Sequence, residues 1–313
     1  MSYSDPIDKY NGAINALIWG DGDRTIAVGG ENCLSFYIFE GEIPNRPVLA
    51  LEVLDIKPNN WPQALVDVYG DVYDDPVKWA RKCAEDYKAP CIMLTLTGTD
   101  PNGLDMSPEE ASKIVADVLS AVKVPLIVYG TGSIGKDSEV LKKVAEDNAK
   151  NNFLLGFAQE DNYKTIAAAG MGFNKSIVGQ TPLDVNLAKQ LNILITQLGL
   201  DPQRIAMDPT TGGLGYGVEY TYSVIERLKL AALKQGDKMT QMPILNNVGQ
   251  EVWKIKENKI KFEDAPSIGD PTERGIAWEV ITAVTLLIAG SNIVTMRHPR
   301  SLQSVSGIVD DLF

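Results

Sequence analysis

The feature that most limits the possible fold is a repeated alternation of two patterns. Between residues 48 and 313, short apolar runs alternate with longer segments that have the period of an amphipathic helix. Such runs are typical of parallel strands, because strands covered on both faces lose the polar alternation of a half-exposed sheet. The predicted strands cover residues 48–53, 91–96, 126–129, 153–157, 175–178, 204–208, 243–247 and 292–296. Eight such units favour a closed (β/α)8 TIM barrel over an open sheet.

Helix starts are marked by residues that can cap the free N–H groups of a first turn. Ser107 with Glu110 forms a capping box, and Asp75 and Asp270 each precede a proline at the first helical position. Together with the apolar periodicity, these signals predict helices over residues 75–87, 107–122, 137–149, 162–169, 184–198, 218–233, 270–288 and 301–312.

The N-terminal part has a different pattern. Residues 14–19 and 25–29 are short apolar runs on either side of a turn at residues 20–23, which predicts a β-hairpin. We therefore divide the chain into an N-terminal hairpin extension, residues 1–47, and a TIM barrel, residues 48–313. We expect the hairpin to plug or cap the barrel, so that the whole forms a single domain.

Composition excludes several classes of protein. A formal net charge of −12 argues against nucleic acid or an anionic membrane as the main partner. The most apolar run, residues 280–289, is about half of the ~20 residues that cross a bilayer, and the N-terminus lacks a signal-peptide pattern. Cys33, Cys83 and Cys91 lack the spacing of a metal or iron-sulfur site. We expect a cytoplasmic protein with reduced thiols and no metal site.

The polar strand ends predict where the chain binds something. In a TIM barrel all loops that follow strands lie at one end, so these residues converge. Glycines among them let backbone N–H groups approach a ligand closely, while hydroxyl and amide side chains supply hydrogen bonds. The candidate binding residues are Thr97, Gly98, Thr99, Gly130, Thr131, Gly132, Ser133, Thr210, Thr211, Gly212, Gly213, Leu214 and Asn246.

One of these loops matches a nucleotide-binding motif. Residues 130–135 fit G-x-G-x-x-G, and Glu160 at the next strand end could bind a ribose, as in a dinucleotide-dependent oxidoreductase. However, the motif lies in the third unit, and Glu160 is farther away than the usual spacing. A P-loop is excluded because Asp137 stands where Ser or Thr should bind magnesium. A tight barrel loop is the simpler interpretation.

Two further polar residues, together with Asn246, suggest a pterin site. Asp55, Asp208 and Asn246 could hold an amide-rich ring through paired hydrogen bonds, although Asp208 before Pro209 could equally just end a strand. His298 is the only histidine, so a metal site with several histidines is excluded. Its position before Pro299 is more typical of a loop residue than of a catalytic one. These residues do not form a recognisable set of catalytic groups, and we predict no catalytic residue.

At several of these positions the sequence resembles a known family. The most telling segments are residues 49–55, 95–101, 128–132, 205–215 and 299–301. They are similar to the small subunit of the corrinoid iron-sulfur protein, related to the delta subunit of acetyl-CoA decarbonylase/synthase, and the resemblance spans nearly the whole chain.

The resemblance implies a barrel subunit paired with a large subunit, the two enclosing a cobamide that contains cobalt. The cobamide would carry a methyl group from a methyltetrahydrofolate methyltransferase to acetyl-CoA synthase in the anaerobic Wood-Ljungdahl pathway of carbon dioxide fixation. In this family the iron-sulfur cluster and the main corrinoid domain belong to the large subunit. The thirteen candidate residues above would then cap the corrin. The alternative is a stand-alone pterin-dependent methyltransferase, with Asp55, Asp208 and Asn246 holding the pterin.

Overall fold

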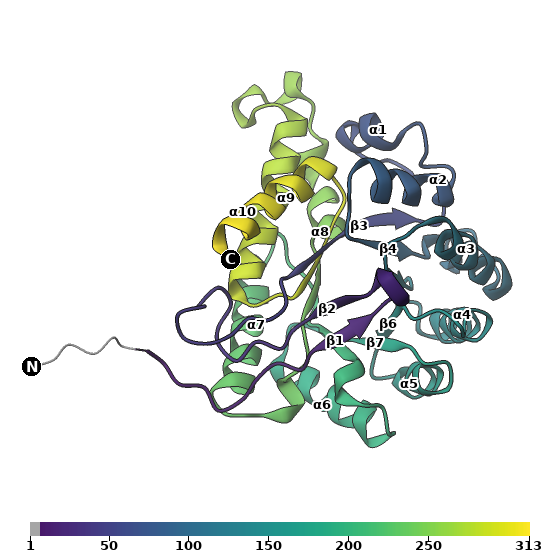
Figure 1. Ribbon diagram of the computed structural model, residues 1–313. Coiled ribbons are helices and arrows are strands. Elements are labelled where there is room, and N and C mark those ends of the chain that lie inside the picture. Colours follow the sequence, from purple (N-terminus) through teal and green to yellow (C-terminus); the bar gives the residue numbers. More distant parts are fainter. Residues whose placement is uncertain (1–6) are drawn as a thin grey trace, which may run out of the picture.

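The computed structural model describes residues 7–313 and contains an eight-stranded parallel sheet (Figure 1). Its strands follow the order β8-β7-β6-β5-β4-β3-β10-β9. They are β3 (Val48–Leu54), β4 (Cys91–Thr95), β5 (Leu126–Tyr129), β6 (Leu154–Ala158), β7 (Ser176–Gln180), β8 (Ile205–Asp208), β9 (Leu245–Asn247) and β10 (Ile293–Met296). Each overlaps a predicted strand, because the apolar runs are buried on both faces.

The two outer strands of this order, β8 and β9, close the barrel almost completely. They meet through a parallel bridge between Met207 and Ile244, where the Met207 N–H donates to the Pro243 carbonyl at 2.8 Å. The predicted TIM barrel is therefore confirmed.

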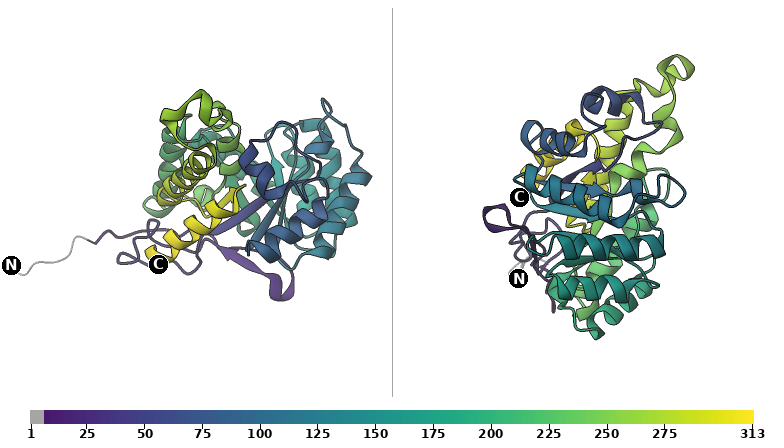
Figure 2. Two further views of the ribbon diagram at one scale, coloured as in Figure 1. Left: turned by 90° about the horizontal axis from the view of Figure 1, so that it is seen from above. Right: turned by 90° about the vertical axis from the view of Figure 1, so that its right-hand side faces the viewer.

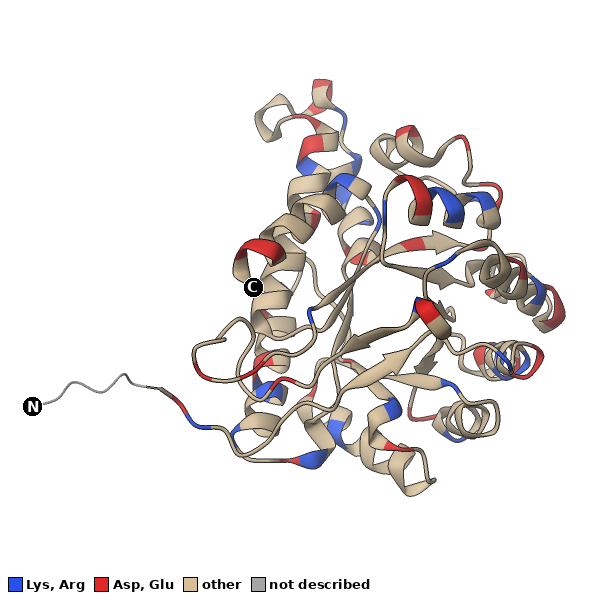
Figure 3. Cartoon of the chain, viewed as in Figure 1, with Lys and Arg blue, Asp and Glu red and all other residues tan. Residues whose placement is uncertain are grey.

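The helices form a ring around the sheet (Figure 2). They are α1 (Gln63–Tyr69), α2 (Pro76–Arg81), α3 (Pro108–Ala121), α4 (Ile134–Asp147), α5 (Tyr163–Gly172), α6 (Val185–Gln197), α7 (Val218–Leu233), α8 (Val248–Trp253), α9 (Pro271–Ala289) and α10 (Pro299–Leu312). Charged residues lie mainly on these helices and on the loops (Figure 3). Within residues 7–313, no helix is long and apolar enough to cross a bilayer.

Several helices differ from the prediction in their presence or in their bounds. Helices α1 and α8 lie in segments predicted as loops; α1 forms there because Tyr69 packs against Trp61 and Trp79. Helix α2 is shorter than predicted and continues as a π-helical turn, Lys82–Asp86. Helix α4 begins at Ile134, three residues before the predicted start at Asp137.

The predicted hairpin is confirmed and lies at one end of the barrel (Figure 2). Strands β1 (Leu17–Trp19) and β2 (Ile26–Val28) are antiparallel. Leu17, Trp19 and Val28 are fully buried and share one apolar cluster with residues inside the barrel. The Gly20 N–H donates to the carbonyl of Asn152, just before β6, so the hairpin covers the N-terminal ends of the strands. It plugs the end opposite to the loops that carry the candidate residues.

A buried ion pair holds the segment after the hairpin against the barrel. The Lys229 ammonium on α7 donates to Glu31 at 2.5 Å and to the Asn292 side chain at 2.8 Å. Burial alone would raise the pKa of Glu31, but Lys229 and Asn292 together bring that pKa below its ordinary value. All three side chains are buried, so each depends on the other two for its hydrogen bonds.

Removing the charge of Lys229 tests this network. Lys229→Met leaves the Glu31 carboxylate buried without a cation, so we expect the free energy of unfolding to fall by about 3 to 5 kcal/mol. The measurement is urea denaturation at pH 7. The matched control is Lys254→Met, because Lys254 pairs with Glu251 at the surface, and there we expect a loss of about 1 kcal/mol or less. Equal losses in both variants would contradict the role of the buried pair.

Candidate functional site

Near the C-terminal ends of the strands, the inside of the barrel changes from apolar to polar. Ala50, Met93 and Ile127 belong to the apolar interior cluster. Two residues further along each strand stand Glu52, Thr95 and Tyr129, since alternate residues of a strand face the same side. We call the inward-facing set at this level the polar layer: Glu52, Thr95, Tyr129, Gln180, Asp208, Asn247 and Thr295.

Asp208 is one of the two buried acids of the polar layer. Its Oδ2 accepts hydrogen bonds from the Tyr129 hydroxyl at 2.7 Å and the Gln180 amide at 2.9 Å. Its Oδ1 accepts from the Thr210 N–H at 2.9 Å. Burial raises the pKa of Asp208, although the hydrogen bonds from Gln180 and Tyr129 oppose that rise. Both oxygens are therefore already engaged within the chain.

Glu52 is the second buried acid of the layer. Its carboxylate accepts from the Thr95 hydroxyl at 2.7 Å and from the Arg297 Nε at 2.5 Å. The Arg297 guanidinium also lies over the ring of Trp61, 5.2 Å from the ring centre. The Thr295 hydroxyl donates to the Asn247 side chain at 2.7 Å, so these two residues of the layer are also hydrogen-bonded to each other. The polar layer is thus held together by its own contacts.

A pocket of about 400 Å³ opens directly above the polar layer, and we call it the mouth pocket. It contains Thr97, Gly130, Thr131, Thr210 and Thr211 from the candidate set. It also contains Asp208, one of the three residues considered for a pterin. The other lining residues were not candidates: Thr95, Asp100, Tyr129, Phe157, Gln180, Asn247, Gln250 and Glu251. Alternate residues of a strand face the same side, so the apolar interior positions predict which residues near the strand ends also face inward. This pattern could have identified Tyr129, Gln180 and Asn247.

The remaining candidates lie beside or beneath this pocket. Asn246 is fully buried and faces the opposite side from Asn247, donating to the Thr211 hydroxyl at 3.1 Å and accepting from Ser291. Thr99 is also fully buried, and its hydroxyl donates to the Leu96 carbonyl at 2.8 Å. The other candidates outside the lining are Gly98, Gly132, Ser133, Gly212, Gly213 and Leu214. Direct contact of these residues with a ligand stays a prediction.

The loop that matches a nucleotide-binding motif is already occupied by a side chain of this protein. The N–H groups of Thr131 and Gly132 donate to the Asp137 carboxylate at 3.0 and 2.8 Å. A phosphate would need these same groups, and the carboxylate would repel it. This contact also explains the early start of α4, because Asp137 lies in its first turn. The loop is a structural turn.

The three residues proposed for a pterin do not converge on one pocket. Asp208 lies at the base of the mouth pocket with both oxygens engaged, while Asn246 faces away from it. Asp55 lies under the 97–99 loop, where its Oδ1 accepts from the Gly98 N–H at 2.8 Å. Burial raises the pKa of Asp55 to about 6, opposed by hydrogen bonds that include the one from Gly98.

The single histidine has a structural role. His298 is buried, its ring stacks on Trp253 at 5.8 Å, and its Nδ1 accepts from the Arg300 N–H at 3.1 Å. It is therefore the N-cap of α10, in agreement with the interpretation as a loop residue. Burial, together with the nearby positive charge of Arg300, lowers the pKa of His298 to about 4.

Two glycines of the 130–135 loop test its structural role. A Cβ on Gly130 would lie 2.6 Å from the Asp137 carboxyl carbon, whereas a Cβ on Gly135 would meet nothing within 4 Å. We expect Gly130→Ala to lower the free energy of unfolding by about 1 to 3 kcal/mol. Gly135→Ala, the control inside α4, should leave it unchanged or raise it by up to about 1 kcal/mol. Urea denaturation measures both, and equal effects would contradict this role.

The pKa of His298 predicts a pH dependence of stability. The ordinary value is 6.5 and the folded value about 4, so between them the unfolded chain binds more protons and acid favours unfolding. The stabilisation by neutral His298 is therefore present above pH 6.5 and is lost as the pH falls toward 4.

His298→Asn keeps an N-cap but removes the titration. We expect the unfolding free energy of this variant to fall less steeply than that of the wild type between pH 6.5 and pH 4. The measurement is urea denaturation at several pH values. Parallel pH profiles in the two proteins would contradict the assignment.

Comparison with known proteins agrees with the resemblance found in the sequence. The family model described as "CO dehydrogenase/acetyl-CoA synthase delta subunit" matches residues 16–297. The acetyl-CoA decarbonylase/synthase complex subunit delta of Methanothermobacter thermautotrophicus is 38% identical over 303 residues, covering 96% of this chain and 76% of the relative. The subunit of the same name in Methanocaldococcus jannaschii is 34% identical over 320 residues, covering 98% of this chain and 76% of the relative.

Solved structures agree on the fold at much lower sequence identity. A dihydropteroate synthase from Xanthomonas albilineans matches with a TM-score of 0.56 and 13% identity, covering 87% of this chain and 95% of that one. The enzyme from Yersinia pestis, solved with a sulfonamide drug, has a TM-score of 0.55 and 13% identity, with 85% and 93% covered. This likeness concerns the barrel alone. From the family match and the relatives, the chain belongs to the CO dehydrogenase/acetyl-CoA synthase delta subunit family.

Proposed function

We propose that this chain is the small subunit of a heterodimeric corrinoid iron-sulfur methyl carrier, and that its mouth pocket covers one face of the cobamide. Such a cobamide supplies a cobalt ion that carries the methyl group between a methyltetrahydrofolate methyltransferase and acetyl-CoA synthase in the Wood-Ljungdahl pathway. The large subunit would hold the iron-sulfur cluster and most of the cobamide. The relatives are named as subunits of a complex, which supports a protein partner.

The observation that carries this proposal is the chemistry of the mouth pocket. Hydroxyl and amide side chains of Thr97, Thr131, Thr210, Asn247 and Gln250 line it, and these groups suit the amide-bearing edge of a corrin. The buried acid at its base, Asp208, accepts three hydrogen bonds from within the chain. The residues present therefore fit a cobamide.

The same residues support a covering role rather than a catalytic one. His298 is buried as the cap of α10 and does not line the mouth pocket, so this chain would offer no histidine to a cobalt ion held there. Among residues 7–313, no group of three or more histidine, cysteine, aspartate or glutamate residues could hold a metal ion. In this proposal the chain shields and positions the cobamide in the cytoplasm, and the methyl transfer uses groups on its partners.

Co-purification tests the proposal. This chain is run on a size-exclusion column alone and with a large subunit plus cobamide, and the visible absorbance of the corrinoid is followed. We expect a one-to-one complex that carries the corrinoid colour, and a colourless peak for the chain alone. A chain that stays alone and colourless in the presence of both would contradict the proposal.

A substitution at the mouth pocket tests whether the cobamide contacts this part of the chain. Thr97 is exposed at the mouth pocket, so Thr97→Arg should leave folding intact while its bulk obstructs the cobamide. We expect the cobamide to dissociate at least about tenfold faster from the complex, because a side chain forced into the contact costs more than ~1.4 kcal/mol. The control is Thr25→Arg, which is exposed in the hairpin at the opposite end. Equal dissociation rates in the two variants would contradict contact at the mouth pocket.

A further inference from the structure

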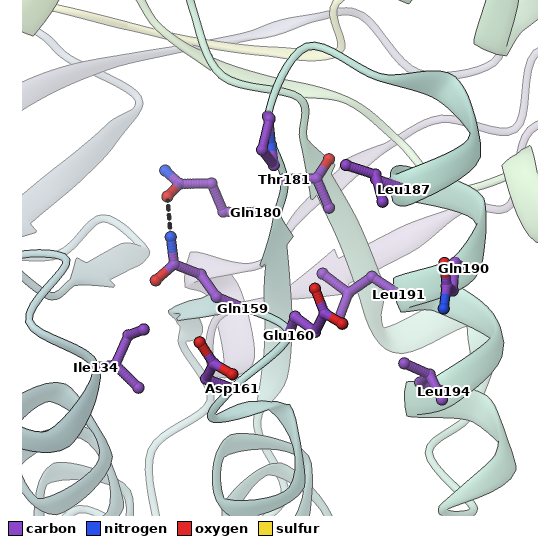
Figure 4. A pocket seen from close by; sticks show the side chains of 11 residues that line it. Ile134, Gln159, Glu160, Asp161, Gln180, Thr181, Leu187, Gln190, Leu191 and Leu194 are labelled. Carbon is purple, nitrogen blue, oxygen red and sulfur yellow. Dashed lines mark hydrogen bonds between the residues drawn. The ribbon is translucent and has the colours of Figure 1, made fainter.

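A second, smaller pocket lies next to the mouth pocket, and we call it the side pocket (Figure 4). It measures about 180 Å³, compared with about 400 Å³ for the mouth pocket. Whole ligands of drug size usually need about 300 Å³ or more. The side pocket is therefore suited to one substituent of a larger ligand.

The two pockets share a wall made of hydrogen-bonded amides. Gln180 lines both, and its carbonyl oxygen accepts from the Gln159 amide at 3.0 Å, drawn as a dashed line in Figure 4. On its other side the Gln180 amide donates to Asp208 at 2.9 Å. A ligand that covers the mouth pocket can thus extend one arm past Gln180 into the side pocket.

The side pocket has one apolar wall. Leu187, Leu191 and Leu194 of α6 form it, and Ile134 stands on the opposite side (Figure 4). Such a surface suits methylene groups and disfavours a charged end, because moving a charge out of water without a partner is costly.

The polar groups of the side pocket have unused hydrogen-bonding capacity. Thr181 is 7% exposed, and its hydroxyl has no hydrogen-bond partner within residues 7–313. Glu160 and Asp161 are exposed, and neither side chain makes an ion pair or a hydrogen bond within the described part of the chain. Carboxylates accept hydrogen bonds and repel other carboxylates, whereas a hydroxyl can donate or accept.

We infer that the side pocket binds a primary carboxamide arm of the ligand that covers the mouth pocket. Its N–H groups would donate to Glu160 or Asp161, its oxygen would accept from the Thr181 hydroxyl, and its methylene groups would lie on the leucines of α6. A carboxylate or an ester lacks these N–H donors. The inference rests on the proposed function, since a cobamide carries such arms around its ring.

The variant Thr181→Val tests ligand binding without removing a hydrogen bond that the folded chain needs. The Thr181 hydroxyl has no partner to lose, so its replacement by a methyl group of similar shape should leave the free energy of unfolding of the chain unchanged or raise it. In the complex with the large subunit, the same variant should bind an amide-bearing cobamide about three- to tenfold more weakly, the usual effect of one lost hydrogen bond.

Glu160→Gln supplies an independent test, with Glu139→Gln as its control, because Glu139 is exposed on α4 outside the side pocket. Affinities are measured from the visible spectrum of the corrinoid during titration of each complex. We expect Glu160→Gln to weaken the binding and Glu139→Gln to match the wild type. A corrinoid whose amides are replaced by methyl esters should bind wild type more weakly and should not distinguish wild type from Glu160→Gln, because an ester has no N–H to donate to Glu160.

The outcomes separate the two proposals. If the wild-type complex fails to retain the amide-bearing cobamide, the proposed function is wrong and the inference falls with it. If the wild type retains it but Thr181→Val and Glu160→Gln bind it equally well, only the inference is overturned. If Glu160→Gln weakens association with the large subunit when cobamide is absent, a basic side chain of the partner occupies the side pocket, and the carboxamide assignment is wrong.

Discussion

The closed parallel hydrogen-bonding pattern of the barrel is the constraint on which the rest of the structure depends. It brings all eight strand ends to one level, so polar side chains from distant parts of the sequence meet inside a narrow, poorly hydrated space. There they must pair with one another, because an unpaired buried polar group costs about 1 to 3 kcal/mol. The contacts of Tyr129 and Gln180 with Asp208, and of Arg297 with Glu52, satisfy that requirement.

These pairings also determine what the barrel can do. Asp208 already accepts three hydrogen bonds, from Tyr129, Gln180 and Thr210, which leaves about one acceptor site of its carboxylate for a ligand. The groups left to meet a ligand are the hydroxyls and amides above it, such as Thr131 and Gln250. Dihydropteroate synthases share this barrel fold, and in this chain the mouth pocket is lined by hydroxyl and amide groups together with the acids Asp100, Asp208 and Glu251.

The sequence predicts much of the fold because each strand and cap has a local physical cause. The strand at 126–129 and the helix start at Asp270 are found correctly, since burial on both faces and N-capping leave visible patterns. Helix α1 escapes prediction because its first turn has no side-chain cap, and Tyr69 instead holds it by contact with Trp79 of α2.

The candidate site is predicted less completely for a similar reason. The sequence brings the right loops together, but whether Asn246 or Asn247 faces the mouth pocket depends on the register of β9, where a shift of one residue reverses the side. The hydrogen bonds from Thr131 and Gly132 to Asp137 depend on where α4 begins, which an N-cap search placed three residues late.

The hairpin gives the barrel a closed floor. Leu17, Trp19 and Val28 cover one end of an interior that is already packed with apolar side chains, so a ligand can reach the polar layer only from the opposite end. If the proposed function is correct, any two proteins that act on a cobamide held at the mouth pocket would have to approach it from this same end. They would then bind one after the other.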